Sequence, residues 1–143
     1  MNSIENKSIQ QLENDYWPPI SKGESSSYLI KTCHELRSKK IGTFEIEDLR
    51  IMIGQGIGME YLVPKAVKEL SQNILAEGDF YEGDLLKSLL TSDIAYWKAN
   101  KGQWQEVCEI FEANKKILEE DDTTNEIRNG WFMSFEKFRQ LQL

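Results

Sequence analysis

Apolar residues recur three and four positions apart along most of this chain, which is the spacing of residues on one face of an α-helix. Leu29, Ile30, Cys33 and Leu36 form one such stripe, and we expect them to share a buried face. The remaining stripes are Ile4, Ile9 and Leu12; Leu49, Met52 and Ile53; Leu62, Val63, Ala66, Val67 and Leu70; Leu85, Leu86, Leu89 and Leu90; Ile94, Ala95 and Trp97; Trp104, Val107, Cys108, Phe111 and Leu118; and Ile127, Trp131, Phe135 and Phe138. No segment alternates apolar and polar residues between hairpin turns, so no β-strand is expected. The pattern predicts an all-α, compact bundle of about seven helices.

Capping residues predict where several of these helices begin. Ser3 is the expected N-cap of a helix over residues 3–14, and one of the serines at 25–27 is the expected N-cap of the next. Thr123 and Glu126 have the spacing of a capping box, which would open the last helix.

The densest glycine run is Gly54-Gln55-Gly56-Ile57-Gly58. A dinucleotide-binding fingerprint needs G-x-G-x-x-G between a strand and a helix, whereas this run is G-x-G-x-G after a helical stripe. The lysine of a phosphate-binding P-loop is missing as well. We interpret the run as a tight turn between two helices, in which glycine supplies positive φ angles.

Length and composition indicate one folded domain, residues 1–143. With 40% hydrophobic and 29% charged residues, the chain is typical of a soluble globular protein and not of a disordered one. No apolar run approaches the roughly 18–20 residues of a membrane helix, and the first seven residues lack the order of a signal peptide. We therefore expect a cytoplasmic protein without membrane contact, in which Cys33 and Cys108 are buried, reduced thiols.

Negative charge is concentrated in the middle of the chain. Residues 45–84 hold nine acids and three bases, so this stretch alone accounts for six of the seven net negative charges. Binding to a nucleic-acid backbone requires clustered Lys and Arg, and the chain offers only the doublets Lys39-Lys40 and Lys115-Lys116. We expect a basic protein partner and no nucleic acid. A further acidic run, residues 119–122, is expected to be a solvated turn between helices, with a secondary anionic contact as the alternative.

An aromatic and acidic stretch, Asp79-Phe80-Tyr81-Glu82-Gly83-Asp84, lies in an expected loop over residues 76–83. It does not fit a calcium-binding EF-hand, because the third and fifth ligand positions would be Tyr81 and Gly83. Two interpretations remain open and are compatible. Asp79 or Asp84 accepts hydrogen bonds from helix N–H groups while the aromatic residues pack, or the stretch contacts a basic partner through aromatic residues surrounded by carboxylates.

The sequence gives little support for a catalytic site or a metal site. Cys33 and His34 are neighbours, and adjacent helical side chains point about 100° apart, so they cannot act as a nucleophile and its base. One histidine and two distant cysteines give no zinc-ligand spacing. We expect no catalytic residue, no metal and no cofactor, and therefore a binding protein.

The central stretch also resembles a known family, the immunity proteins of contact-dependent growth inhibition (CDI) systems. The resemblance covers roughly residues 12–90 and is looser at its start, from Tyr28-Leu29 to His34-Glu35-Leu36-Arg37. Two central runs carry it: Glu47-Asp48-Leu49-Arg50-Ile51-Met52-Ile53-Gly54-Gln55 with Ile57-Gly58, Tyr61-Leu62 and Pro64, and Ala76-Glu77-Gly78-Asp79-Phe80-Tyr81-Glu82-Gly83-Asp84-Leu85-Leu86.

The resemblance implies a small helical protein that binds and blocks the toxin domain of a sibling effector. It also implies that this toxin is commonly a nuclease, whose surface must be basic in order to hold phosphates. An acidic inhibitor would then occlude the toxin by steric and electrostatic means. The candidate contact residues are Glu77, Asp79, Tyr81, Glu82 and Asp84. The alternative is a helical adaptor that regulates another basic protein without catalysis.

Overall fold

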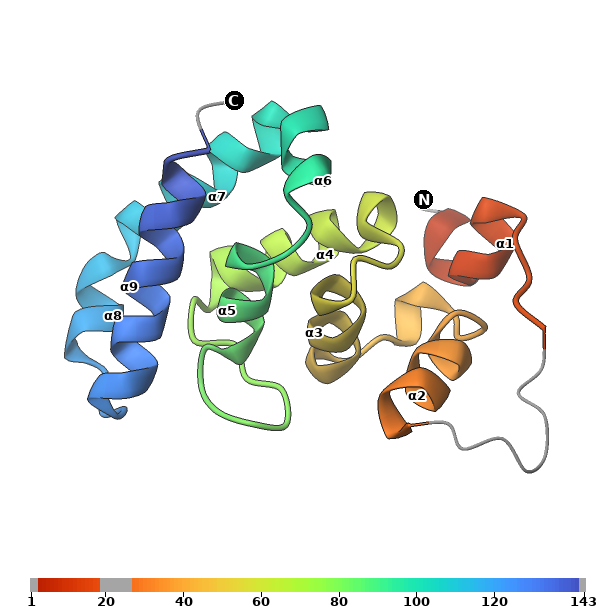
Figure 1. Ribbon diagram of the computed structural model, residues 1–143, viewed down its shortest axis with the longest axis horizontal. Coiled ribbons are helices and arrows are strands. Elements are labelled where there is room, and N and C mark those ends of the chain that lie inside the picture. Colours follow the sequence, from red (N-terminus) through yellow and green to blue (C-terminus); the bar gives the residue numbers. More distant parts are fainter. Residues whose placement is uncertain (1–2, 19–26, 142–143) are drawn as a thin grey trace.

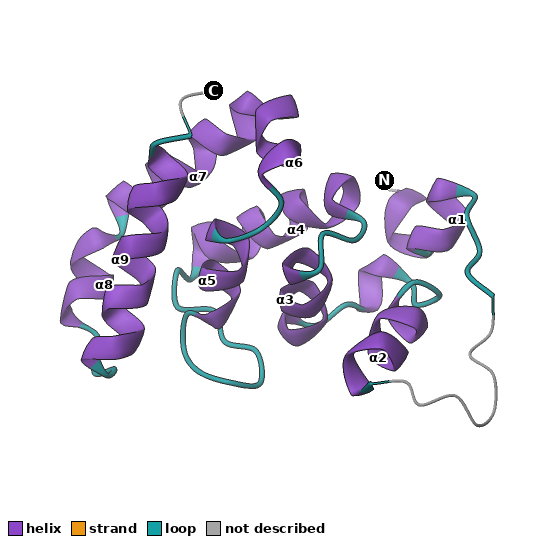
Figure 2. Ribbon diagram, viewed as in Figure 1, coloured by secondary structure: helices purple, strands orange, loops and turns teal. Residues whose placement is uncertain are grey.

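The computed structural model describes residues 3–18 and 27–141. Within these residues every regular element is a helix, and Ser8 and Lys40 form a single isolated bridge (Figures 1 and 2). The prediction of an all-α fold is confirmed. The elements in chain order are the 3₁₀-helix η1 (Ser3–Asn6), α1 (Ile9–Glu13), α2 (Tyr28–Leu36), the 3₁₀-helix η2 (Ile41–Thr43), α3 (Ile46–Gly54), α4 (Met59–Gln72), α5 (Asp84–Leu90), α6 (Ile94–Ala99), α7 (Lys101–Ala113), α8 (Lys115–Glu120) and α9 (Asn125–Arg139).

Three helices form the centre of the molecule. Helix α3 packs against both α4 and α5, with α1 and α2 on one side of this group and α7, α8 and α9 on the other (Figure 1). The predicted stripes of these helices are buried, and Met52, Leu62 and Leu85 are inaccessible to solvent. None of the helices in the described residues is long and apolar enough to cross a bilayer.

The C-terminal helices pack mainly through aromatic residues. Phe111 of α7 stacks on Phe135 of α9 with ring centroids 3.8 Å apart, and Trp97 of α6 meets Phe138 edge to face at 5.0 Å. Trp131, Phe135 and Phe138 are all buried, as their spacing predicts. These contacts fix α9 against the core, and α9 in turn packs against α5.

The predicted helix ends are right at some positions and wrong at others. Ser27 caps α2, because its Oγ accepts a hydrogen bond from the Ile30 amide at 3.1 Å. At the other end of the chain, Thr124 caps α9 in place of the predicted Thr123 by accepting from the Ile127 amide at 3.1 Å. The predicted capping box therefore does not mark the start of α9.

Two of the expected helices are interrupted. Residues 3–14 form a 3₁₀-helix and a separate α-helix, and Ser8, not Ser3, caps the α-helix through the Gln11 amide at 3.3 Å. The helix expected from Trp104 to Leu118 breaks at Asn114, which separates α7 from α8. The Asn114 side chain donates to the Ile110 carbonyl at 2.8 Å, and such side chains compete with the helical backbone for hydrogen bonds.

The turn between α3 and α4 has the predicted conformation. Gly56 and Gly58 have φ angles of 70° and 65°, in the left-handed region that favours glycine. A Cβ on Gly58 would lie 2.5 Å from Cδ1 of the buried Ile9, so α1 packs directly on this turn.

The apolar face of α2 is only half covered. Cys33 and Leu36 are buried as predicted, but Leu29 and Ile30 are 39% and 55% exposed, so the prediction for these two residues is wrong. Periodicity shows that residues share a helical face, but it does not show that a neighbouring element is long enough to cover that face. The cysteines are both free thiols, and Cys108 is partly exposed where burial was expected.

Candidate functional site

The loop over residues 76–83, here called the acidic loop, is fixed from within by Asp84 at the start of α5. This carboxylate is 3% exposed. Its Oδ1 accepts from the Gly78 amide at 2.6 Å, and its Oδ2 accepts from the amides of Phe80 at 3.0 Å and Tyr81 at 3.4 Å. One side chain therefore satisfies three backbone donors of the loop. These donors are loop amides and not the helix N–H groups that the sequence suggested for Asp84, and among the described residues no side chain caps the start of α5.

Helix α3 holds the acidic loop from the other side. Glu47 Oε1 accepts from the Asp79 amide at 2.9 Å, and Arg50 donates to both Glu47 oxygens at 2.6 Å in a two-pronged ion pair. The Arg50 guanidinium also lies over the Phe80 ring at 4.3 Å. The hydrogen bond from Arg50 is the main reason that the pKa of Glu47 is lowered. Glu47 therefore stays ionised and continues to accept the hydrogen bond from the Asp79 amide.

Two glycines allow this close packing. A Cβ on Gly78 would overlap Glu47 Oε1, and a Cβ on Gly83 would overlap the indole ring of Trp131. Gly83 also has a φ of 83°, and its carbonyl accepts from Trp131 Nε1 at 3.2 Å. The loop is thereby joined at its base to α9.

The acidic loop presents most of the predicted contact residues to solvent. Glu77, Asp79 and Glu82 are exposed and Tyr81 is partly exposed. The Phe80 ring, which the sequence suggested would be packed, is 69% exposed although its inner face rests on Arg50. The predicted residues are therefore brought together on one loop, with Asp84 beneath it as the anchor.

A second acidic segment lies next to the loop. The turn between α8 and α9 is held by Arg128, which donates to the backbone carbonyls of Leu118 and Asp121. The pKa of Glu82 is raised, chiefly by the negative charge of Asp121 and also by those of Glu77 and Asp122. The sequence predicted a solvated turn here, with a secondary anionic contact as the alternative. It could not place the turn beside Glu82, because some forty residues separate the two in the chain.

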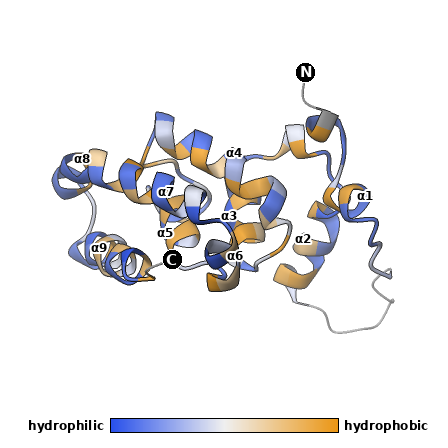
Figure 3. Cartoon of the chain, turned by 90° about the horizontal axis from the view of Figure 1, so that it is seen from above, coloured by the Kyte–Doolittle hydropathy of each residue, from blue (hydrophilic) through white to orange (hydrophobic). Residues whose placement is uncertain are grey.

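An apolar hollow borders the acidic loop on its other side. It has a volume of about 470 Å³ and lies between the start of α2, the end of α3 and the loop; we call it the α2 hollow. Figure 3 shows the hydrophobic residues of α2 at the margin of the molecule. The residues of this hollow that matter below are Tyr28, Leu29, Glu47, Arg50, Asp79 and Phe80.

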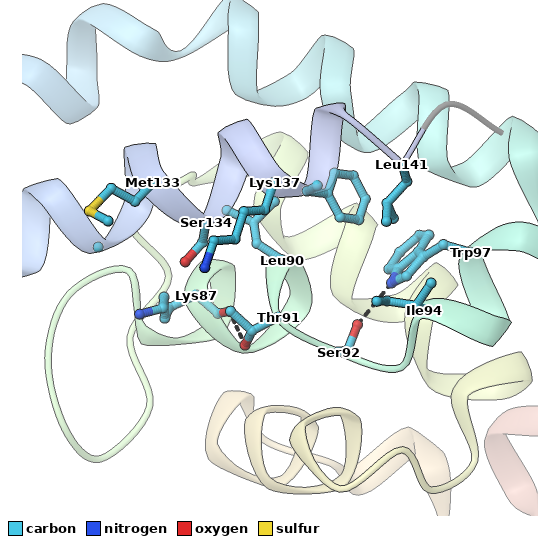
Figure 4. A pocket seen from close by; sticks show the side chains of 12 residues that line it. Lys87, Leu90, Thr91, Ser92, Ile94, Trp97, Met133, Ser134, Lys137 and Leu141 are labelled. Carbon is cyan, nitrogen blue, oxygen red and sulfur yellow. Dashed lines mark hydrogen bonds between the residues drawn. The ribbon is translucent and has the colours of Figure 1, made fainter.

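A second hollow of about 470 Å³, here called the α9 hollow, lies between α5, α6 and α9 (Figure 4). It was not predicted, because its walls come from stripes that periodicity assigned to separate helices. In Figure 4 the ammonium groups of Lys87 and Lys137 lie along the same side of this hollow. Its apolar walls are formed mainly by Leu90, Ile94, Trp97, Met133, Phe138 and Leu141.

The described residues contain no group of three or more His, Cys, Asp or Glu side chains placed to hold a metal ion. His34, which the sequence places near Cys33, has its Nε2 at 2.9 Å from the Pro18 carbonyl and packs edge to face with Trp17. This histidine therefore contributes to holding the chain before residue 19 against α2.

Comparison with known proteins gives one family. A family model described as CDI immunity proteins matches residues 11–107, which is more than half of the chain and includes α2 to α6, both walls of the α2 hollow and the whole acidic loop. No curated protein and no solved structure matches the chain.

Proposed function

This chain belongs to the family of CDI immunity proteins, and we propose that it neutralises its cognate CDI toxin through the surface built on the acidic loop. The partner would be the toxin domain at the C-terminus of the effector, and we propose that this domain is a nuclease. Such an enzyme must present cations to bind phosphates, so an acidic inhibitor can cover the same surface and exclude the substrate.

One observation carries the proposal, namely a set of carboxylates on the acidic loop and the neighbouring turn that take part in no ion pair. Among the described residues, no Lys, Arg or His forms an ion pair with the side chains of Glu77, Asp79, Glu82, Asp121 or Asp122. The raised pKa of Glu82 reflects the resulting repulsion. Repulsion within a fixed surface disfavours the free protein and is relieved when a cationic partner binds.

The anchoring of the acidic loop supports the same conclusion. Asp84, Glu47 and Arg50 hold the loop backbone, so its exposed side chains are already arranged before the partner arrives. Binding then orders few additional groups, and less of the interaction free energy is lost as conformational entropy.

The test is a kinetic titration against the toxin domain encoded immediately upstream of the gene for this chain. Electrostatic steering raises association rates by about 10–10³-fold at low salt, so we expect the association rate to fall steeply as salt is added. The variant Glu77→Gln/Asp79→Asn/Glu82→Gln should lose most of that salt dependence and protect growing cells less well from the toxin.

The matched control is Glu60→Gln/Glu106→Gln/Glu109→Gln, which removes three exposed carboxylates from α4 and α7 and changes the net charge equally. Its association rate should stay close to that of the unmodified chain. An association rate that is the same at low and high salt would contradict recognition by charge. An equal loss of association rate in the two triple variants would mean that the interface does not lie on the acidic loop.

A further inference from the structure

Exposed apolar side chains gather around the α2 hollow. Tyr28 is 78% exposed, Leu29 39% and Phe80 69%, and all three line the hollow. Exposed apolar groups that occur singly are ordinary, whereas a contiguous group with charged neighbours is typical of a protein-binding surface. Resting on the function proposed above, we propose that the α2 hollow receives an apolar side chain of the toxin domain, and that this contact anchors the complex.

The shape of the hollow is set before binding. Its floor is the end of α3, where the Arg50 carbonyl accepts from Ser88 Oγ of α5 at 2.7 Å. One wall is the start of α2, capped by Ser27. The other wall is Phe80, whose amide is bonded to Asp84 and whose ring rests on Arg50. A partner side chain would therefore enter a formed site with little reorganisation.

Continuity of charge identifies the toxin as the occupant. Asp79 and Phe80 belong to both the acidic loop and the α2 hollow, so a partner that covers the loop also covers the hollow. The carboxylates at the edge of the hollow are Glu47, which is paired with Arg50, and Asp79, which has no ion pair with any described residue. An apolar side chain flanked by lysine or arginine fits this arrangement, as expected on the surface of a basic protein.

The two parts of the surface should affect different rate constants. Charges act over several ångströms and guide the encounter, so the acidic loop should control the association rate. An apolar side chain acts only after it is desolvated in contact, so the α2 hollow should control the dissociation rate.

The experiment measures both rate constants for Tyr28→Ala/Leu29→Ala against the toxin domain encoded immediately upstream, at low and high salt. We expect the dissociation rate to rise roughly tenfold or more, which is the effect of losing one buried apolar side chain. The association rate and its salt dependence should remain unchanged. The control is Met133→Ala, which removes an apolar side chain that is 65% exposed in the α9 hollow and should leave both rates unchanged.

A second variant tests the hollow by filling it. Gln55 is exposed and lines the hollow, so Gln55→Trp should obstruct it and weaken toxin binding without removing an apolar contact. Thermal unfolding of each variant checks that the fold is retained. If the unmodified chain binds the toxin and the double variant dissociates no faster, the inference about the hollow is overturned while the proposed function stands. If the unmodified chain does not bind the toxin at all, the proposed function itself fails.

Discussion

The α2 hollow and the α9 hollow have nearly the same volume, but the charged residues around them have opposite signs. Each encloses about 470 Å³ and has largely apolar walls. The α2 hollow is bordered by Glu47 and Asp79 and continues into the acidic loop, whereas the α9 hollow is flanked by Lys87 and Lys137. Volume and apolar walls do not distinguish the two hollows as binding sites. The charge around each hollow is therefore the feature that indicates which of them faces a basic toxin.

They also differ in how the surrounding side chains are held. Phe80 and Asp79 at the α2 hollow lie on a loop whose backbone is bonded to Asp84 and Glu47. At the α9 hollow, Lys87 is partly exposed and Lys137 is exposed, and neither makes a side-chain hydrogen bond or ion pair with another described residue. A fixed acidic surface suits specific recognition, while lysines without a bonded partner contribute mainly a diffuse positive field.

The largest expected effect comes from removing the anchor of the acidic loop. Asp84→Ala leaves three loop amides without their acceptor and should lower the free energy of unfolding by about 2–4 kcal/mol. Urea denaturation measures this change, and amide hydrogen exchange should show the loop opening. The control is Asp93→Ala, which removes a cap bonded to one exposed amide of α6 at 3.1 Å and should cost about 1 kcal/mol. Equal losses in the two variants would mean that the loop is not held as described.

The base of the acidic loop offers a second test, because Gly83 contacts Trp131 and so joins the loop to α9, which lines the α9 hollow. Gly83→Ala introduces a Cβ where φ is 83° and where the Trp131 ring already lies, and we expect a loss of about 2–3 kcal/mol in unfolding free energy. Gly102→Ala is the matched control, since no atom lies within 4 Å of the added Cβ. Alanine should stabilise that helical position by about 0.5–1 kcal/mol, and calorimetric melting temperatures should therefore move in opposite directions.

Reversing the charge of the α9 hollow would remove the contrast between the two regions. Lys87→Glu/Lys137→Glu should raise the association rate with the toxin domain by roughly two- to tenfold at low salt, because Lys87 lies one helical turn after Asp84 and its positive charge opposes the field of the acidic loop. The dissociation rate should not change. Lys98→Glu/Lys101→Glu alters the net charge equally on exposed positions of α6 and α7, and a comparable gain there would show that net charge, and not its place, sets the rate.

The smallest expected effect concerns pH. The like charges of Asp121, Glu77 and Asp122 raise the pKa of Glu82 above its usual value of 4.5. Between the ordinary and the raised pKa the folded state therefore binds more protons than the unfolded state, so the repulsion at Glu82 is relieved as the pH falls and returns as it rises. Because protonation also removes a charge from the acidic loop, association with the toxin should slow over the same interval. Glu82→Gln should show a weaker pH dependence of the association rate than the unmodified chain does.

Much of this fold follows from local sequence, because helix formation depends on residues three and four positions apart. The stripe of α4, the cap at Ser27 and the left-handed turn at Gly56 and Gly58 all appear where the pattern predicts them. The loop over residues 76–83 was predicted too, but Asp84 accepts from amides of the loop and not from the helix N–H groups expected for it. Errors arise where two local signals compete, as at Thr123 and Thr124, or where a side chain such as Asn114 interrupts a continuous stripe.

The amino-acid sequence by itself determined that the chain is helical, that its negative charge is concentrated near the middle and that the family resemblance centres there. Only the tertiary structure decided which charges and apolar groups act together. It placed Asp121 beside Glu82, set Phe80 on Arg50 and left Tyr28 and Leu29 uncovered next to the acidic loop. The reason is that hydrophobic burial specifies a face but no partner for it, whereas charge–charge distances between remote segments exist only once the helices have packed.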